Sequence, residues 1–260
     1  MRMNLTSWMV ALAIGAGSIA IPGATVSAQE TFSKTQVNEL HNIIRQYMLE
    51  NPALLQEMIE KLQIAEREQQ EKKSIAAIES NADILFRNKT DVVVGNPDGN
   101  VTMVEFFDYN CGYCKRSVAD VLRLTEEDKN LRIVMKEFPI LSEGSQIASR
   151  AAIASKKQGK YWEFHLAMMA SQGSIDGEEK VMAIAAEAGL DVEKLKADMK
   201  ADEATINKEL AETQALAAAL GIGGTPAFIV DTKLLPGALP YEELASVVKT
   251  VRDNGGCKFC

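Results

Sequence analysis

The sequence has only two histidines and four cysteines in 260 residues, so few side chains are available for a metal site. His41 lies beside an apolar stripe in a region of helical periodicity, and His165 follows the aromatic segment 161–164. Both surroundings are more typical of packing or solvent exposure than of metal ligation. The methionines recur at helical spacing, which favours a role as core filler over one as copper ligands.

A long apolar run is absent beyond residue 28, where no segment approaches the ~20 residues that a membrane span needs. Residues 1–28 are typical of a secretory signal peptide, with Arg2, an apolar core at 5–21 and the small residues Val26-Ser27-Ala28. Glycines and Pro22 interrupt this core, which favours cleavage near Gln29 over an uncleaved anchor. We therefore expect a soluble exported protein in an oxidising compartment.

Basic residues are in the minority. Arg2 is the only charged residue of 1–28, so the remainder holds 27 Lys and Arg against 36 Asp and Glu, a net charge of −9. This acidity argues against nucleic acid or an anionic membrane as a partner. About 230 residues exceed one domain of ~100 to 150, leaving room for a domain with an insertion and an additional element.

The four cysteines form two C-x-x-C pairs, Cys111 with Cys114 and Cys257 with Cys260. The first pair directly follows the apolar run 101–107 and opens a helical stretch. A cysteine at a helix N-terminus lies beside free backbone N–H groups and the positive end of the helix dipole, which stabilise a thiolate. The first pair therefore predicts a redox site.

The same spacing leaves two alternatives, a four-sulfur zinc site and an inert structural disulfide. The segment 223–230 argues against the zinc site, because it reads as a turn that enters a strand through Thr225-Pro226. We expect Pro226 to be cis. Thioredoxin-like proteins need such a loop opposite their cysteines, where its backbone receives an extended substrate strand.

Residues 35–80 read as helix almost without interruption. Apolar side chains recur at three- and four-residue spacing in 37–48 and again in 55–65, and Asn51-Pro52 divides the two helices as N-cap and first helical residue. Residues 66–73 have no apolar face, which predicts a solvated helix or a flexible linker. We expect 35–65 to be an oligomerisation element, the alternative being helices folded back on the catalytic domain.

The remaining pattern alternates strands with helices and predicts an α/β fold with a parallel strand-helix-strand unit. The expected elements are strands at 92–94 and 101–107, a helix at 111–124, a strand at 131–138, helices within 145–220, a strand at 227–230 and a helix at 241–254. The expected domains are a signal peptide at 1–28, a helical extension and linker at 29–88, a redox domain at 89–254 with an insertion at about 142–220, and a tail at 255–260.

The segment Phe106-Phe107-Asp108-Tyr109-Asn110-Cys111-Gly112-Tyr113-Cys114, with Thr225-Pro226 far downstream, resembles the DsbA-like branch of the thioredoxin superfamily over about residues 90–254. The helical extension further resembles the suppressor-of-copper-sensitivity ScsC proteins. The resemblance implies a thioredoxin fold with a helical insertion and an N-terminal helical extension. It makes Cys111 the nucleophile and Cys114 the resolving thiol, with no cofactor beyond their redox-active disulfide.

The resemblance also assigns further site residues. Thr225 and Pro226 match the cis-proline loop, and Glu105 and Lys136 match charged residues on the two strands beneath the site. An unpaired carboxylate in an apolar strand is costly, so Glu105 is expected to act with Lys136 or water as a proton relay for Cys114, or only as a structural ion pair. The expected substrate contacts are Gly112, Tyr113 and Gly224.

The dipeptide Gly112-Tyr113 replaces the Pro-His pair of the oxidase DsbA and, with Thr225, looks more like the isomerases DsbC and DsbG. We expect a disulfide isomerase or reductase; the alternatives are a DsbA-type oxidase and a copper-handling or chaperone protein. The resemblance implies a periplasmic homo-oligomer, a trimer ahead of a dimer, linked to copper tolerance. Its partners would be misfolded or cysteine-containing exported proteins and a membrane thiol reductase of the DsbD/ScsB type.

The second pair, Cys257 and Cys260, has three possible uses in an oxidising compartment. It can close as a short-range disulfide, bind a soft metal such as Cu(I), or act as a second redox pair. We favour a non-catalytic disulfide or a disordered tail.

Overall fold

The computed structural model describes residues 32–260, so the expected signal peptide and its cleavage site lie outside the described residues. The chain divides into two compact units, with the boundary between Leu62 and Gln63. Among the described helices, none combines the length and apolar character that crossing a membrane requires.

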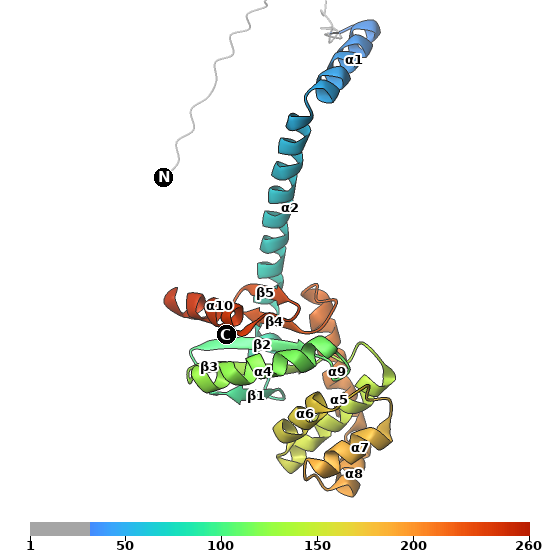
Figure 1. The fold of residues 1–260 in the computed structure, drawn as a ribbon, viewed down its shortest axis with the longest axis vertical. Helices are drawn as coiled ribbons and strands as arrows, with labels where there is room; N and C mark the ends of the chain where they lie inside the picture. Colours follow the sequence, from blue (N-terminus) through green and yellow to red (C-terminus); the bar gives the residue numbers. More distant parts are fainter. Residues whose placement is uncertain (1–31) are drawn as a thin grey trace, which may run out of the picture. The chain divides into compact units, whose positions relative to one another are not determined.

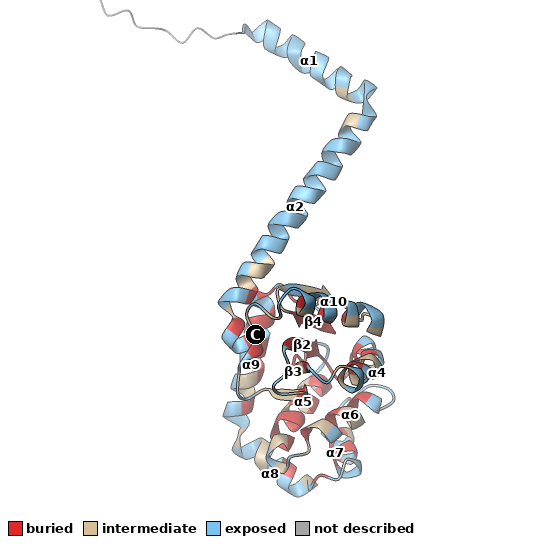
Figure 2. Cartoon of the chain, turned by 90° about the vertical axis from the view of Figure 1, so that its left-hand side faces the viewer, coloured by how far each residue is buried: buried red, intermediate tan, exposed pale blue. Residues whose placement is uncertain are grey.

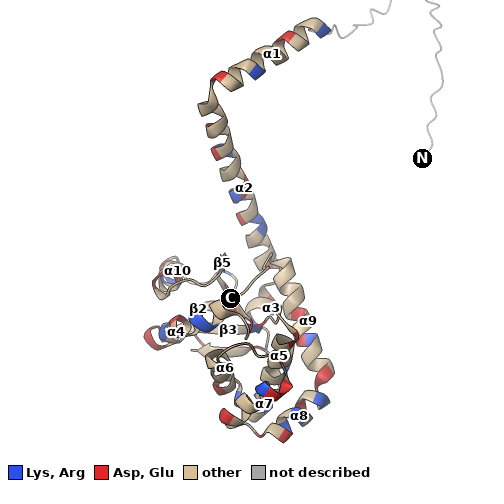
Figure 3. Cartoon of the chain, turned by 45° about the vertical axis from the view of Figure 1, so that its right-hand side comes forward, with Lys and Arg blue, Asp and Glu red and all other residues tan. Residues whose placement is uncertain are grey.

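Two helices, α1 (Lys34–Glu50) and α2 (Pro52–Ser80), form the N-terminal extension. Ser33 and Gln36 make a reciprocal capping box at the start of α1, and the Asn51 side chain closes its end by donating to the Tyr47 carbonyl at 2.8 Å. The expected break at Asn51-Pro52 is confirmed. Residues 66–73 are part of α2 and carry both signs of charge (Figure 3).

Apolar side chains remain exposed along α1 and the first half of α2 (Figure 2). They recur at the spacing that the sequence predicts, and α1 has no buried residue. The exposed set is Val37, Leu40, Ile43, Ile44, Tyr47 and Leu49 on α1, and Leu55, Met58, Ile59, Leu62 and Ile64 on α2.

A five-stranded mixed sheet organises the second unit (Figure 1). Its strands are β1 (Val92–Gly95), β2 (Val101–Phe107), β3 (Leu131–Glu137), β4 (Ala227–Val230) and β5 (Lys233–Pro236). Their order is β1-β3-β2-β4-β5, with β2 and β3 parallel and the other pairs antiparallel. Every residue of β2 is buried, including Thr102 and Glu105, as is usual for a mostly apolar strand that is covered on both faces.

Helices cover both faces of the sheet. On one face α4 (Gly112–Glu127) and α10 (Tyr241–Asp253) pack with the helical insertion around Met103 and Phe107. On the other, the end of α2, the short α3 (Ala82–Phe86) and the end of α9 pack around Val104 and Phe106. We call these the first and the second cluster.

The helical insertion follows β3 and precedes β4. It consists of α5 (Glu143–Ser155), a 3-10 turn (Lys156–Gln158), α6 (Tyr161–Ala170), α7 (Glu178–Glu187), α8 (Val192–Ala201) and α9 (Glu203–Ala219). Gly144 marks where α5 approaches another segment, because a Cβ there would lie 1.8 Å from the Ile175 carbonyl oxygen. Within the insertion, α5 thus packs tightly against the loop between α6 and α7.

Candidate active site

Cys111 caps the N-terminus of α4 at the point where β2 has ended. The backbone N–H of Cys114 donates to the Cys111 sulfur at 3.3 Å, and the Cys111 thiol donates to the Thr225 carbonyl oxygen at 3.1 Å. Both cysteines are free thiols; Cys111 is 6% exposed and Cys114 is fully buried. Of the two cysteines, Cys111 is therefore the more accessible.

The loop before β4 lies against Cys111. The Thr225–Pro226 peptide bond is cis, as expected. A Cβ added at Gly223 or Gly224 would meet no atom within 4 Å, so this backbone borders open space. A pocket of about 170 Å³ runs along the loop and includes Gly224, Thr225 and Pro226 in its lining. Gly224 is exposed, Thr225 is half-buried and Pro226 is buried, so the accessible backbone beside the Cys111 sulfur lies on the Gly224–Thr225 side of the loop.

Burial raises the pKa of the Cys114 thiol well above its ordinary value, and the Cys111 sulfur and the carboxyl of Glu105 act in the same direction. A backbone hydrogen bond from Asp108 opposes the shift. The two cysteines therefore have unequal roles, because Cys114 remains a thiol until a neighbouring group accepts its proton.

Glu105 lies on β2 beneath the cysteines. Met103 and Phe107, two residues to either side, point into the first cluster together with Cys114, so strand alternation places Glu105 on this same face. Its side chain is nearly fully buried, and burial raises its pKa to about 8. A carboxyl with this pKa can exchange a proton near neutral pH.

Lys136 lies on the opposite face of the sheet, so the expected pairing of Glu105 with Lys136 is wrong. In the parallel register Glu105 stands beside Met135 and Phe106 beside Lys136, and side chains alternate between faces. Lys136 pairs instead with Asp91 at 2.5 Å and donates to the Ile84 carbonyl at 2.6 Å.

The Lys136–Asp91 pair is buried. Desolvation lowers the pKa of Lys136 and raises that of Asp91, and each partner opposes the shift of the other. Because Lys136 also holds the Ile84 carbonyl of α3, the pair fastens the segment between α3 and β1 to β3. Its position supports a structural role.

Asp108 and Asn110 belong to the site but were not singled out in the sequence. The buried Asp108 carboxylate accepts the backbone N–H groups of Ile140 (2.8 Å) and Leu141 (3.0 Å). The Asn110 amide donates to the Ile175 carbonyl at 2.9 Å, and its oxygen accepts the Ile175 N–H at 2.7 Å. These hydrogen bonds connect the loop before Cys111 to the insertion. In the sequence, the only indication of these contacts is that two polar residues precede the first cysteine by one and three positions.

Lys115, directly after Cys114, holds a second segment of the insertion. Its ammonium donates to the carbonyl oxygens of Ser171 (2.7 Å) and Gly173 (3.1 Å), and burial lowers its pKa. Lys180 donates to the carbonyls of the same loop, at Gln172 and Ser174. The loop 171–174 is thereby fixed beside the start of α4.

A buried polar cluster lies behind the site. One carboxylate oxygen of Glu137 accepts hydrogen bonds from the hydroxyls of Tyr109 (2.8 Å) and Tyr161 (2.7 Å), and burial raises the pKa of Glu137 to about 7. His165 stacks on Trp162 with ring centroids 5.0 Å apart, and burial lowers its pKa to about 3. Packing of His165 is confirmed, and His41 is exposed.

Exposed residues surround the two cysteines, beginning with the dipeptide between them. Gly112 is the first residue of α4, and Tyr113 is 61% exposed with the Arg116 guanidinium 4.3 Å from its ring centroid. Ile140 and Leu141, held by Asp108, are exposed as well. The surface around the Cys111 sulfur is therefore partly apolar.

The second cysteine pair lies at the other end of β2. Cys257 and Cys260 form a disulfide, and their sulfurs lie 4.0 and 3.9 Å from the Thr102 carbonyl oxygen. The two pairs therefore do not contribute to one four-sulfur site.

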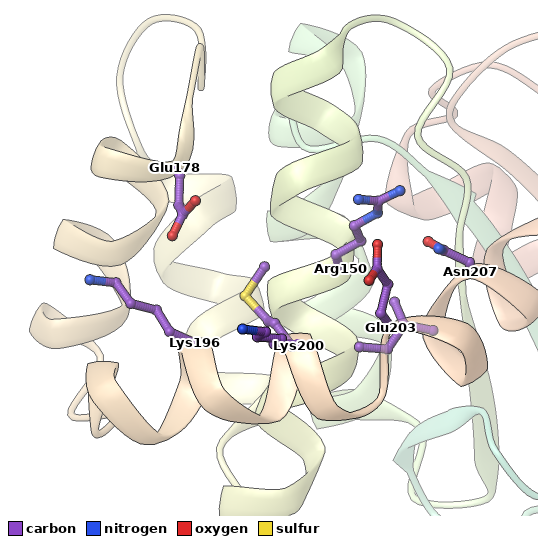
Figure 4. A pocket seen from close by; sticks show the side chains of 8 residues that line it. Arg150, Glu178, Lys196, Lys200, Glu203 and Asn207 are labelled. Atoms are coloured by element: carbon purple, nitrogen blue, oxygen red, sulfur yellow. The ribbon is translucent and has the colours of Figure 1, made fainter.

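A separate pocket of about 290 Å³ lies among α5, α7, α8 and α9 (Figure 4). Its polar lining mixes cations and carboxylates and includes neither the cysteines nor the cis-proline loop. The labelled side chains are Arg150, Glu178, Lys196, Lys200, Glu203 and Asn207.

Solved structures and curated proteins resemble this chain. A thioredoxin-like oxidoreductase from Silicibacter pomeroyi is 47% identical, with a TM-score of 0.63, covering 66% of this chain and 97% of that one. Proteus mirabilis ScsC in a transitional conformation is 26% identical, with a TM-score of 0.63, covering 86% of this chain and 98% of that one. An Na(+)/H(+) antiporter NhaA from Herminiimonas arsenicoxydans is 32% identical over 164 residues, 62% of this chain and 26% of the antiporter.

The chain spans about a quarter of the length of the antiporters that it matches. The family model of the DSBA-like thioredoxin domain matches residues 102–249, more than half of the chain. The matched span contains Cys111, Cys114, the helical insertion, the cis-proline loop and all of β2 except Val101. This chain therefore belongs to the DsbA-like thioredoxin family.

Proposed function

We propose that the protein catalyses thiol–disulfide exchange on exported proteins, with Cys111 as the attacking thiol. The observation that carries this proposal is the position of the Cys111 sulfur, at the N-terminus of α4 and 3.1 Å from the Thr225 carbonyl. A substrate strand lying along Thr225 brings its disulfide to that sulfur.

The Cys111 thiolate attacks one sulfur of the substrate disulfide. A bond forms between Cys111 and that sulfur, the substrate S–S bond breaks, and the other substrate sulfur leaves as a thiolate that takes up a proton. Reduction is completed when Cys114 loses its proton and attacks Cys111, which forms the Cys111–Cys114 disulfide and releases the remaining substrate thiol. In isomerisation another substrate thiolate attacks instead and frees Cys111.

Glu105 is the proposed acceptor of the Cys114 proton. It shares the face of the sheet with Cys114, and its carboxyl, with a pKa of about 8, can take up a proton and return it near neutral pH. The raised pKa of Cys114 makes such an acceptor necessary for the resolving step. Lys136 has no part in this relay, because it lies across the sheet.

Within thiol–disulfide exchange, we propose isomerase or reductase activity as the specific reaction. The dipeptide Gly112-Tyr113 lacks the histidine that stabilises the thiolate in the oxidase DsbA, which argues against a strongly oxidising pair. An isomerase must be kept reduced, so we infer a membrane thiol reductase of the DsbD/ScsB type as partner and the periplasm as the location. The substrates are misfolded or cysteine-containing exported proteins.

A homo-oligomer, with a trimer ahead of a dimer by resemblance, is proposed from the extension. Its apolar side chains on α1 and α2 are exposed in the single chain, and apolar patches of this kind mark interaction sites. The similarity to Proteus mirabilis ScsC covers 86% of this chain, which is more than the catalytic domain. Several active sites around one client raise the local concentration of thiolate.

Refolding of scrambled ribonuclease tests the proposed specific reaction. The wild-type protein, kept reduced, should restore ribonuclease activity, whereas Cys111→Ser should not. Cys114→Ser should retain part of the isomerase activity, because substrate thiols can free Cys111, but should lose dithiol oxidation. A wild-type protein that oxidises reduced ribonuclease yet fails to repair the scrambled form would point to an oxidase instead.

A further inference from the structure

The second C-x-x-C pair lies in a folded segment after α10. Cys257 and Cys260 form a disulfide with a Cα–Cα distance of 5.4 Å; Cys257 is half-buried and Cys260 is exposed. The Gly256 N–H donates to the Val251 carbonyl at 3.0 Å, which turns the chain back toward the sheet. The proposed exchange at Cys111 makes no use of this pair.

Three parts of the domain hold this segment, which we call the tail (residues 255–260). The Lys258 N–H donates to the Asp231 carboxylate at 2.6 Å in the turn between β4 and β5. The Arg87 guanidinium, just after α3, donates to the Phe259 carbonyl. The Phe259 side chain packs against the second cluster, which contains Ile78 near the end of α2 and the α3 residues Ala82, Leu85 and Phe86.

The Cys257–Cys260 disulfide does not cross-link distant parts of the fold. It closes a loop of only four residues, and cross-links over short loops remove little entropy from the unfolded chain. Its physical effect is local: it holds 257–260 as a compact loop, in which Lys258 meets Asp231 and Phe259 meets the second cluster.

Cys260 is the more exposed residue of the pair, so an external thiolate that attacks the disulfide would reach it first. Cys111 of the same chain is not placed to make that attack, because the seven residues of β2 alone separate the two pairs by about 20 Å. A thiolate that attacks the tail disulfide must therefore come from another molecule.

We propose that Cys257 and Cys260 are a second thiol–disulfide site, which dithiols reduce, and that reduction releases the tail from α3 and the second cluster. A thiolate of the dithiol attacks Cys260, the Cys257–Cys260 bond breaks, and Cys257 leaves as a thiolate and is protonated. The second thiol of the dithiol, losing its proton, then forms the dithiol's own disulfide and frees Cys260, which takes up a proton. Two electrons and two protons pass to the pair.

The test uses a Cys111→Ser/Cys114→Ser variant, in which only the tail pair can react. After equilibration with dithiothreitol, maleimide labelling and mass spectrometry should find two thiols while near-ultraviolet circular dichroism stays native. Hydrogen exchange in 251–260 and in 82–91 should become at least about tenfold faster on reduction, because opening these segments no longer breaks the tail contacts. This outcome does not depend on whether Cys111 is catalytic.

Two further measurements keep the test decisive. Phe259→Ala, with its disulfide intact, should reproduce the faster exchange at 82–91. Peptide mapping of the wild-type protein distinguishes the two pairs if the double variant folds poorly. A tail pair that is reduced only when the protein unfolds, or a reduced tail with unchanged exchange at 82–91, would overturn the proposal.

Discussion

Cys111 is the N-cap residue of α4 with its sulfur beside Thr225, whereas Cys114 lies in the first turn of the helix and is fully buried. Burial raises the pKa of Cys114 well above its ordinary value. Limiting iodoacetamide should therefore alkylate Cys111 first, which peptide mapping of the reduced protein detects. Preferential labelling of Cys114 would contradict the assignment of the attacking thiol.

Glu105 should make the stability of the protein depend on pH. Its pKa is about 8 in the folded state and ~4.3 in an unfolded chain, so between these values the folded state binds more protons and the free energy of unfolding falls as pH rises. Glu105→Gln removes this loss and should be more stable than the wild type at pH 9 by roughly 5 kcal/mol. Urea unfolding at pH 4.5, 7 and 9 measures the difference.

Glu137→Gln is the matched control for that experiment. The pKa of Glu137 is raised to about 7, so its contribution to the pH dependence should end near pH 7, whereas that of Glu105 continues to about pH 8. If Glu105→Gln and the wild type respond identically to pH, the carboxyl of Glu105 does not titrate as described. The resolving step should also be slower in Glu105→Gln.

Lys136 should matter for stability and not for the reactivity of Cys111. Lys136→Met leaves the Asp91 carboxyl buried without its partner and should lower the free energy of unfolding by roughly 3 to 5 kcal/mol. Adding Asp91→Asn should restore much of the loss. The alkylation rate of Cys111 in the folded variant should equal that of the wild type. A markedly lower rate would show that Lys136 contributes to the reactivity of Cys111.

At the scale of the elements, the loop before Cys111 depends on Asn110. Asn110→Ala removes the paired hydrogen bonds with Ile175 and leaves buried backbone groups unpartnered, which should cost about 1 to 3 kcal/mol. Hydrogen exchange in 171–177 should become faster, and disulfide exchange slower. Unchanged exchange in that loop would show that the tie between insertion and active site is dispensable.

Periodicity predicted the elements that surround the site. The run 101–107, the helix that begins at the cysteines and the next apolar run form β2, α4 and β3, because each is long and strongly patterned. The four-residue β5 and five-residue α3 were not predicted, since they are too short to show a period. Lys136 was placed near Glu105 because sequence alone does not give the register that decides a strand's faces.

The contacts missed in the sequence are long-range ones. Asp108 bonds to residues more than 30 positions away, and Asn110 to Ile175, 65 positions away. Neither partner has a distinctive sequence signal. The cysteines and the cis-proline loop were found because their residue types are rare, whereas the polar residues that hold them are common.

At the scale of the whole molecule, we expect isomerase activity to require the extension, whereas dithiol oxidation and reduction do not. Removing residues 29–62 takes away the exposed apolar side chains of α1 and the start of α2 and leaves the second unit intact. We expect a monomer that keeps dithiol chemistry but loses most isomerase activity. Light scattering measures the mass; a monomeric full-length protein, or a truncated one that repairs scrambled ribonuclease equally well, would refute this role.

Trapping a mixed disulfide tests the central claim most directly. Cys114→Ser cannot resolve the bond between Cys111 and a substrate, so incubation with scrambled ribonuclease should accumulate a covalent complex that dithiothreitol reverses. Mass spectrometry should place the bond at Cys111, and Cys111→Ser should form no such complex. A complex joined through Cys257 or Cys260 instead, or none with Cys114→Ser, would contradict Cys111 as the thiol that attacks substrates.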